Sequence, residues 1–325
     1  MRCPLSGRSR GSLVSDHGVT SGMEPDHCFE HTPCLFCERP NDDELYPASF
    51  GTASFSAETF SARRSSTREH YRIIRCRECG LVRSDPILTE DALNSLYAES
   101  SFTFSSEAPF AAATYSKLLK KLLHRHGVKQ RSLVELGAST GFFLEEALRI
   151  GFDTVLGFEP SRHCCDHASP AVRPYLVNDI FRPELLDGKQ FDVACSFQVI
   201  DHLVKPLEAL KAVTASLVPG GCVLLVCHDA ESLSARLLGR NSPMIDIEHI
   251  HLFSRATIAR LCRDAGLSVL ESGSLANCYP LGYWLRMVSL TRPLAGLLPE
   301  SVLRMPLELK AGNLYIFAQK EAASC

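Results

Sequence analysis

A turn of small residues in the middle of the chain is the first place where the sequence suggests chemistry. A short apolar run is followed by Gly137-Ala138-Ser139-Thr140-Gly141 and then by a helical pattern that starts with Phe142. Glycines at such a turn let the backbone bend sharply and approach a ligand closely. Taken alone, the turn fits a ligand-binding loop and a plain strand-to-helix connection equally well.

Acidic residues follow the next two apolar runs. Glu159 stands where it can accept hydrogen bonds from both hydroxyls of a ribose, a common task of a carboxylate after a second strand. Asp179 could accept the exocyclic amine of adenine, with Ile180 packed on the ring, or it could cap a helix. The same features also fit a dinucleotide enzyme, but the spacing argues against it, because Gly-x-Gly-x-x-Gly would fall on Gly137, Ser139 and Phe142.

The elements that must position these residues alternate along the chain. We predict buried strands at about 132–137, 153–160, 174–179, 191–200 and 222–229, with helices at about 141–151, 161–168 and 205–218. Strands that alternate with helices form a parallel sheet in an α/β fold. Ligands bind such sheets at the carboxyl ends of the strands, which is where the turn and the acidic residues fall.

A longer motif further along the chain indicates a protein family that this sequence resembles. Over about 129–272 the sequence resembles class I S-adenosylmethionine-dependent methyltransferases. The resemblance rests on the glycine turn, on Glu159 and on four further matches: Phe191-Asp192, Val199-Ile200-Asp201-His202-Leu203, Lys205-Pro206 and Pro219-Gly220-Gly221. The resemblance implies a doubly wound, Rossmann-like sheet of seven mostly parallel strands with a final antiparallel hairpin. Ser139 departs from the usual middle glycine and fits without strain only at negative φ, and Asp201 replaces the usual Glu.

The resemblance implies S-adenosylmethionine as cofactor and transfer of its methyl group as the activity. Candidate cofactor-binding residues stand at the ends of the first four strands: Glu135, Gly137, Ala138, Ser139, Gly141, Glu159, Pro160, Asp179, Ile180 and Gln198. A second phrase, in which Ser254 caps a helix and Gly266 ends it, resembles one subgroup of these enzymes. It implies a sixth strand after Gly266 and a last strand at 312–320.

Two Cys-x-x-Cys knuckles precede the methyltransferase-like region. The knuckles predict a zinc-ribbon-like module with one zinc ion bound by Cys34, Cys37, Cys76 and Cys79. This zinc would be structural, because four thiolates complete a tetrahedron and leave no open coordination position. The alternative is that the two pairs are unmetallated. Similar knuckles occur in a related subgroup of these methyltransferases that serves polysaccharide, sugar or secondary-metabolite synthesis, an implication of the resemblance only.

The chain divides into four predicted regions: a polar, disordered tail at 1–30, the zinc-ribbon-like module at 31–86, a helical linker or cap at 87–128, and the methyltransferase domain at 129–325 with a cap insertion at about 236–311. Met23 is a candidate start of the natural chain. The N-terminus has no apolar segment typical of a secretory signal. Most of the 14 cysteines stand singly in apolar stretches, which favours a reducing, cytoplasmic compartment.

Histidines near strand ends are the candidate general bases. His202 follows the fourth strand and is the first choice, with a structural role as the alternative; His228, His249 and His251 come next. Whether the reaction needs a general base stays open; if the acceptor is an oxygen or carbon atom, a base with a pKa near the working pH can be required. Aromatic and polar residues of the insertion suit a pocket for a small acceptor: Phe253, Asn277, Tyr279, Tyr283 and Trp284.

The acceptor is therefore predicted to be a small molecule, sugar-like or hydroxylated. A net charge of −3 and the absence of a basic run oppose a nucleic-acid partner, and no apolar run of about 18 residues predicts a membrane span. Two alternatives stay open: an RNA methyltransferase, and a non-catalytic zinc-ribbon protein with a degenerate methyltransferase fold, which Ser139 alone supports.

Overall fold

The computed structural model describes residues 29–38, 41–51, 54–61, 69–101, 107–287 and 291–321. The predicted tail at 1–30, including Met23, lies almost wholly outside these residues. Within the described part of the chain, no helix is both long and apolar enough to cross a membrane. The eleven cysteines that the structure describes are free thiols.

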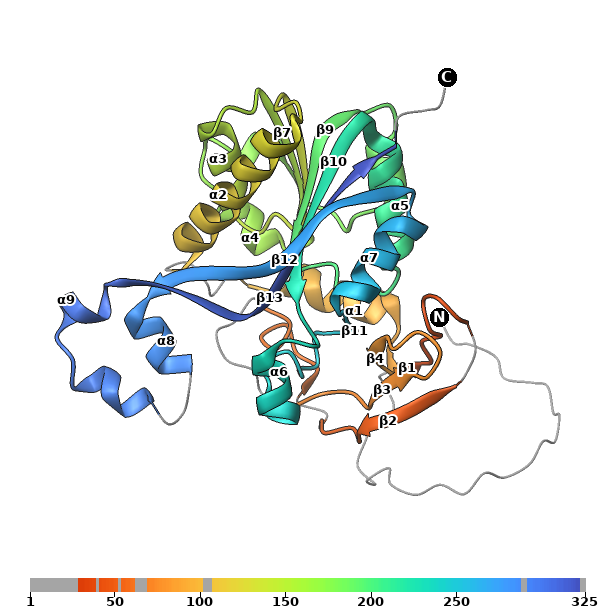
Figure 1. Cartoon of the computed structure of the whole chain (residues 1–325), viewed down its shortest axis with the longest axis vertical. Coiled ribbons are helices and arrows are strands. Elements are labelled where there is room, and N and C mark those ends of the chain that lie inside the picture. The colour runs from red at the N-terminus through yellow and green to blue at the C-terminus, as the bar shows by residue number, and fades with distance from the viewer. Residues whose placement is uncertain are drawn as a thin grey trace.

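A seven-stranded sheet forms the centre of the molecule (Figure 1). Its strand order is β12-β13-β10-β9-β6-β7-β8. The strands β8, β7, β6, β9 and β10 are parallel, whereas β13 is antiparallel to both of its neighbours. The predicted doubly wound sheet with a final antiparallel hairpin is confirmed. Its strands are β6 (Ser132–Leu136), β7 (Thr154–Phe158), β8 (Leu176–Val177), β9 (Phe191–Phe197), β10 (Leu217–His228), β12 (Leu267–Pro280) and β13 (Pro306–Lys320).

Helices cover both faces of this sheet (Figure 1). One apolar cluster joins α2 and α3 to one face, and a second joins α5 and α7 to the other. The predicted cap of α7 is present, because the Ser254 hydroxyl and Thr257 form a reciprocal capping box. The helices are α1 (Glu90–Glu99), α2 (Ala108–His126), α3 (Phe142–Arg149), α4 (Arg162–Asp166), α5 (Pro206–Ser216), α6 (Leu233–Leu238), α7 (Arg255–Asp264), α8 (Leu281–Met287) and α9 (Glu300–Leu303).

The N-terminal segment folds against the carboxyl ends of the parallel strands. Its short strands are β1 (Phe29–Glu30), β2 (Asp42–Tyr46), β3 (Ile73–Cys76), β4 (Val82–Ser84) and β5 (Ile87–Leu88). A later strand, β11 (His251–Leu252), completes its four-stranded sheet by pairing with β4. Cys34, Cys76 and Leu81 also belong to the apolar cluster under α7. The zinc-ribbon-like module and the region after β10 therefore share both a sheet and a core.

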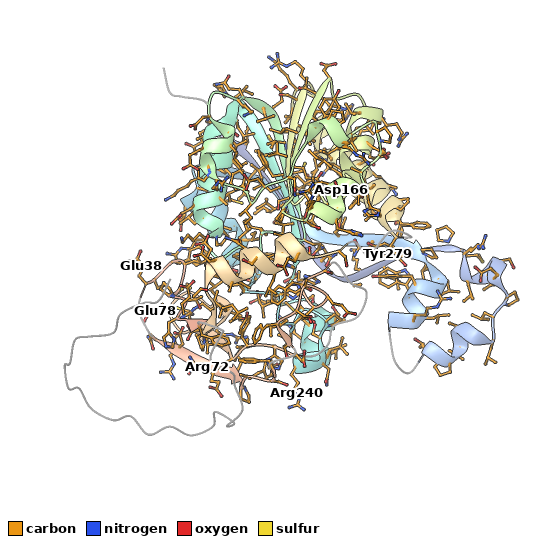
Figure 2. All side chains as sticks on the ribbon, turned by 180° about the vertical axis from the view of Figure 1, so that it is seen from behind. Glu38, Arg72, Glu78, Asp166, Arg240 and Tyr279 are labelled. Carbon is orange, nitrogen blue, oxygen red and sulfur yellow. The ribbon has the colours of Figure 1, made fainter. Side chains whose placement is uncertain are left out.

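The hairpin of β12 and β13 is longer than the sequence suggested. The last strand begins at Pro306 rather than near Gly312, because the two strands stay paired out to Pro280 and Pro306. Beyond the sheet they form an arm that carries α8 and α9 away from the body (Figure 1). Tyr279 lies where this arm leaves the body, far from Glu38 and Glu78 on the module (Figure 2).

Candidate active site

A large cavity lies at the carboxyl ends of the parallel strands. Its volume is about 970 Å³, and its walls come from the ends of β6, β7, β9 and β10, from α1 and α2, from the loop before β11, and from the base of the arm. Ligand cavities typically measure about 300–1,000 Å³. The cavity therefore has room for a nucleoside-sized ligand together with a second molecule.

The glycine turn closes one end of this cavity. Gly137 has φ +73°, and a Cβ atom built there would lie 2.3 Å from Cγ2 of Val199. Ser139, the departure from the family pattern, also adopts positive φ, at 51°. The condition for an unstrained serine, a negative φ, is therefore not met: the turn keeps the glycine-type backbone, and Ser139 carries a left-handed strain of about 1–2 kcal/mol.

Glu159 is held directly against this turn. Its Oε2 accepts a hydrogen bond of 2.8 Å from the Ser139 amide, and its Oε1 accepts one of 2.9 Å from the Ser161 amide. Burial raises the pKa of Glu159 to about 6, although the two backbone hydrogen bonds oppose the shift. Each carboxylate oxygen keeps a second lone pair for a ligand hydroxyl.

Glu135 is a second buried carboxylate at the same end. It is 2% exposed and lines the cavity, and its Oε2 has no hydrogen-bond partner among the described residues. Burial, followed by the charge of Glu159, raises the pKa of Glu135 well above its usual value. A buried carboxylate without a partner is costly, so a cationic ligand group would relieve this site.

The predicted cofactor residues divide into two sets. Those that line the cavity are Glu135, Gly137, Ser139, Glu159, Pro160, Ile180 and Gln198. Ala138, Gly141 and Asp179 are not part of its wall; Gly141 serves the turn, and Asp179 forms an ion pair with Arg182. The cofactor role of all ten residues stays a prediction.

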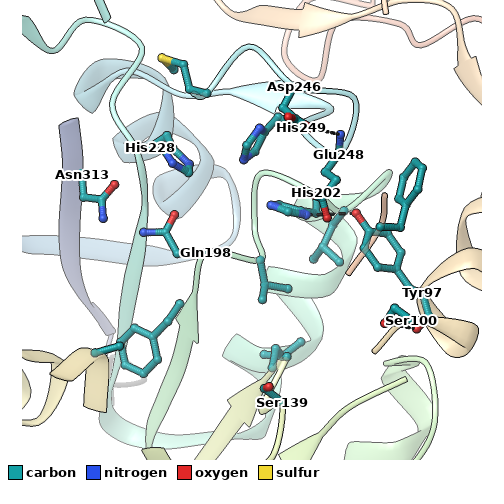
Figure 3. A pocket seen from close by; sticks show the side chains of 18 of the residues that line it. Tyr97, Ser100, Ser139, Gln198, His202, His228, Asp246, Glu248, His249 and Asn313 are labelled. Carbon is teal, nitrogen blue, oxygen red and sulfur yellow. Dashed lines mark hydrogen bonds between the residues drawn. The ribbon is translucent and has the colours of Figure 1, made fainter. Parts of the chain in front are cut away.

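Gln198 occupies a special backbone position. It has φ +58°, and its amide donates a 2.7 Å hydrogen bond to the carbonyl of Val226. Non-glycine residues in this conformation often mark functional sites. Figure 3 shows Gln198 between Ser139 at one end of the pocket and the histidines at the other. It therefore stands where the two halves of the cavity meet.

Three imidazoles gather at the other end around Asp201. Nδ1 of His228 lies 3.3 Å from Oδ2 of Asp201, and Nε2 of His202 lies 3.9 Å from Oδ1. The ring of His249 lies 4.8 Å from that of His202 and 4.7 Å from that of His228, centroid to centroid. Figure 3 shows these three rings at the same end of the pocket.

Asp201 is the residue whose importance sequence reasoning missed, since it stood out only as a mild departure from Glu. Its side chain is 1% exposed. Burial opposes ionisation, yet the hydrogen bond with His228 and the neighbouring imidazoles hold the pKa of Asp201 well below its usual range. The signal available was its position directly after β9, beside His202.

Tyr97 of α1 positions His202. Its hydroxyl lies 3.0 Å from Nδ1 of His202, and burial raises the pKa of Tyr97 well above its usual value, so the phenol stays protonated. In the tautomer whose Nδ1–H donates to the oxygen of this hydroxyl, the lone pair of Nε2 is left to accept a proton. The helical segment before the sheet thus contributes to the site as well as covering it.

His251 is placed differently from the other three histidines. It is 1% exposed, it is not among the residues of the cavity wall, and its Nε2 lies 3.4 Å from the carbonyl of Val204. Burial lowers the pKa of His251 to about 4. Its catalytic role stays an untested prediction that this placement does not support.

The base of the arm supplies aromatic rings. The rings of Tyr279 and Tyr283 lie 4.3 Å apart and those of Tyr279 and Trp284 lie 5.6 Å apart, centroid to centroid. All three residues line the cavity together with Asn277, whereas Phe253 is buried in the core under α7. Sequence reasoning did not identify Phe60, Lys310 and Asn313 as further wall residues.

The four knuckle cysteines meet on the module. One Sγ atom from each of Cys34, Cys37, Cys76 and Cys79 lies within 4.8 Å of the others. The first knuckle also contacts α7, because Arg260 donates a 3.2 Å hydrogen bond to the Phe36 carbonyl and its guanidinium lies 4.6 Å from the Phe36 ring centroid. The predicted cluster of four cysteines is confirmed as a cluster.

Comparison with known proteins settles the family. Residues 108–272, about half of the chain, match the model of a methyltransferase domain family. The chain belongs to this methyltransferase family. The match spans the glycine turn, Glu159 and the Asp201-His202 phrase, so the resemblance to class I S-adenosylmethionine-dependent methyltransferases is confirmed.

Individual proteins of known sequence or structure share only low sequence identity with this chain. A tRNA U34 carboxymethyltransferase from Azotobacter vinelandii is 29% identical over 108 residues, which cover 30% of this chain and 33% of that protein. The chain thus spans about a third of the length of this curated relative.

Solved structures of S-adenosylmethionine-dependent methyltransferases are also similar. One from Clostridium acetobutylicum has 12% identity, 65% and 92% coverage of the two chains and a TM-score of 0.45. One from Thermotoga maritima has 22% identity, 67% and 93% coverage and a TM-score of 0.44.

Proposed function

We propose that this methyltransferase transfers a methyl group from S-adenosylmethionine to a small hydroxylated acceptor, such as a sugar-like metabolite. One observation carries the proposal: a single cavity joins the glycine turn and Glu159 to a cluster of imidazoles and aromatic rings. A donor and an acceptor placed at these two ends would meet near Gln198. Holding two reactants in line can account for roughly 7–11 kcal/mol of a barrier.

The donor end fits S-adenosylmethionine group by group. The second lone pairs of the Glu159 carboxylate would accept the ribose hydroxyls, and Ile180 would pack against the adenine. The buried Oε2 of Glu135 would accept a hydrogen bond from the ammonium of the amino-acid part. When bound, the donor supplies an activated methyl group, so the protein needs to orient and deprotonate rather than to activate.

The acceptor end would supply the proton acceptor. We assign this role to Nε2 of His202, because Tyr97 fixes the other ring nitrogen and the Asp201 carboxylate lies close enough to stabilise an imidazolium. The aromatic rings at the base of the arm would pack on the apolar faces of an acceptor, and Asn277 and Asn313 would bind its hydroxyl groups.

A structural zinc in the module belongs to the same proposal. Four thiolates around zinc at about 2.3 Å would lie about 3.8 Å from one another, and the cluster limit of 4.8 Å is compatible with that arrangement. The ion would brace a module that contributes Phe60 to the cavity wall and that holds β11, next to the wall-forming loop, by pairing it with β4.

An RNA acceptor is the second candidate, and the similarity to a tRNA-modifying relative supports it. The net charge of −3 and the aromatic, partly acidic wall at the acceptor end oppose it. A degenerate, non-catalytic fold receives less support than the sequence suggested, because Ser139 keeps the backbone conformation of the glycine that it replaces.

Calorimetry with S-adenosylhomocysteine tests the donor half. We expect micromolar to sub-millimolar binding, weakened by about 1.5–3 kcal/mol in Glu159→Ala, the range for hydrogen bonds to a charged group. The matched control is Glu99→Ala, an exposed carboxylate on α1. Failure of the wild-type protein to bind at millimolar ligand would refute the proposed activity.

A second experiment separates the acceptor half. Release of S-adenosylhomocysteine is followed with hydroxylated metabolites and with transfer RNA as acceptors. With the small acceptor, Tyr283→Ala should lower turnover while donor affinity changes by less than about 0.5 kcal/mol, because one of two substrates loses contacts. Turnover with transfer RNA alone would favour the second candidate.

A further inference from the structure

Asp201, His228 and His249 form a donor set that the proposed methyl transfer does not use as a unit. One ligand atom from each lies within 4.8 Å of the others. The three residues come from the turn after β9, the end of β10 and the loop before β11. Figure 3 shows His228 and His249 beside each other at the acceptor end of the pocket.

Hydrogen bonds to the backbone of Asp201 and His249 hold this set in place without involving the three candidate ligand side chains. The carbonyl of Asp201 accepts hydrogen bonds from the amides of Ile250 at 2.9 Å and His251 at 3.0 Å. The hydroxyl of Ser84 donates a 2.8 Å hydrogen bond to the carbonyl of His249. The loop that carries His249 is therefore fixed from both sides, which is the preorganisation that a metal site requires.

The burial of Asp201 gives a second, independent reason to look for a cation. Its Oδ1 has no hydrogen-bond partner among the described residues, and its side chain is 1% exposed. Within the part of the chain that the structure describes, this carboxylate pairs with imidazoles, at 3.3 Å and 3.9 Å, and with no lysine or arginine. A buried carboxylate is stabilised by a paired charge or by metal coordination.

We propose that Asp201, His228 and His249 bind one divalent transition-metal ion at the acceptor end of the cavity. Two imidazoles and one carboxylate are a donor set typical of Zn²⁺, Fe²⁺, Co²⁺ or Ni²⁺, whereas Mg²⁺ and Ca²⁺ prefer oxygen ligands throughout. Ligands about 2.1 Å from an ion lie about 3.0–3.4 Å apart in octahedral or tetrahedral geometry. The observed 3.3 Å between Nδ1 of His228 and Oδ2 of Asp201 falls in that range.

This site differs in kind from the cysteine cluster. Four thiolates close a coordination sphere, whereas three protein ligands leave at least one position open. His228 and His249 both line the cavity, so the open position faces the space proposed for the acceptor. A hydroxyl or carbonyl oxygen of the acceptor would complete the coordination there. Binding of the metal alone does not depend on the proposed methyl transfer.

The experiment titrates the full-length protein, its cysteine cluster first loaded with one equivalent of Zn²⁺, with Co²⁺ and follows binding by calorimetry and visible absorption. We expect the wild type to take up one ion with the weak bands of nitrogen and oxygen ligands, without the intense thiolate-to-cobalt band of a cysteine site. Asp201→Asn and His228→Gln should each weaken this ion at least about tenfold. The control His124→Gln, an exposed histidine on α2, should bind like the wild type.

Binding of S-adenosylhomocysteine reports whether each variant is folded. If Asp201→Asn loses it, His228→Gln decides, because that side chain is 26% exposed and tolerates replacement better. The proposal is overturned if the wild type binds no Co²⁺, if only the thiolate band appears, or if a folded His228→Gln binds Co²⁺ as tightly as His124→Gln does.

Discussion

The two ends of the cavity are built in opposite ways. The donor end comes from strand ends that are consecutive in the sequence, and its key contact joins Ser139 to Glu159, 20 residues apart. The acceptor end joins Ser84 to His249, 165 residues apart, and also includes α1 and the arm. The donor end is thus a local property of one α/β unit. The acceptor end depends on a module that must dock correctly.

The largest effect should come from preventing zinc binding at the site proposed in the module. Cys76→Ser should abolish zinc binding at the cysteine cluster, which can contribute roughly 10–16 kcal/mol to folding of such a segment. We expect protease cleavage within 31–86 while affinity for S-adenosylhomocysteine stays within about 0.5 kcal/mol, because the two ends are separate. The control Cys278→Ser, a partly buried thiol on β12, should keep one zinc by elemental analysis. If Cys76→Ser also lost affinity for S-adenosylhomocysteine, the donor end would not be independent of the module.

Gly137→Ala should damage the donor end by about 3 kcal/mol. The new Cβ would lie 2.3 Å from Val199 at φ +73°, which combines overpacking with left-handed strain. Denaturant unfolding and donor calorimetry measure the effect. Gly51→Ala, which meets nothing within 4 Å, is the control and should change stability by less than about 0.5 kcal/mol. Equal effects of both substitutions would contradict the tight fit of the turn.

Ser84→Ala should weaken the acceptor end alone. It leaves the buried carbonyl of His249 without this hydrogen bond, a loss of about 2 kcal/mol in the free energy of unfolding. Donor affinity should not change. Ser95→Ala removes an exposed hydroxyl that bonds within α1 and serves as the control. If donor affinity fell in proportion to stability, the two ends would be one cooperative unit.

The pH dependence of donor binding and of stability tests the role of Glu159 at the donor end. With the pKa of Glu159 at about 6, donor affinity should rise about tenfold between pH 5 and 7 as the carboxylate ionises. Stability of the unliganded protein should respond in the opposite direction: the raised folded pKa stabilises the protein as pH falls from about 6 toward the unfolded value. Glu159→Gln should remove this contribution; an unchanged slope in that variant would assign it to another group.

Ser139→Gly should have the smallest effect. The backbone already has φ +51°, so glycine relieves strain of about 1–2 kcal/mol but adds freedom to the unfolded chain. We expect a net stabilisation of about 0.5–1 kcal/mol in denaturant unfolding, with unchanged donor affinity. A loss of stability would show that the serine side chain, rather than its backbone, is needed at this position.

The same contrast explains what could be predicted from the sequence. Strand ends and the glycine turn follow from local patterns, so the sheet and the residues of the donor end could be predicted. The imidazole cluster could be predicted only in part, because the two-residue spacing of His249 and His251 would put both side chains on the same face of a regular strand. In the structure, His249 lies in the loop before β11 and only His251 belongs to the strand, so the two side chains are placed differently. Which of them faces the cavity depends on the pairing of β11 with β4, and no local pattern encodes that pairing.

The position of β13 has a consequence for how the protein reaches its folded state. This strand is the last of the sheet to leave the ribosome, yet it lies inside the sheet, between β10 and β12. Until residues 306–320 emerge, both neighbours present strand edges without partners, and such edges invite pairing between chains. In a nascent chain of this methyltransferase, the edges of β10 and β12 are therefore the parts of the sheet that stay unpaired longest, until β13 inserts between them.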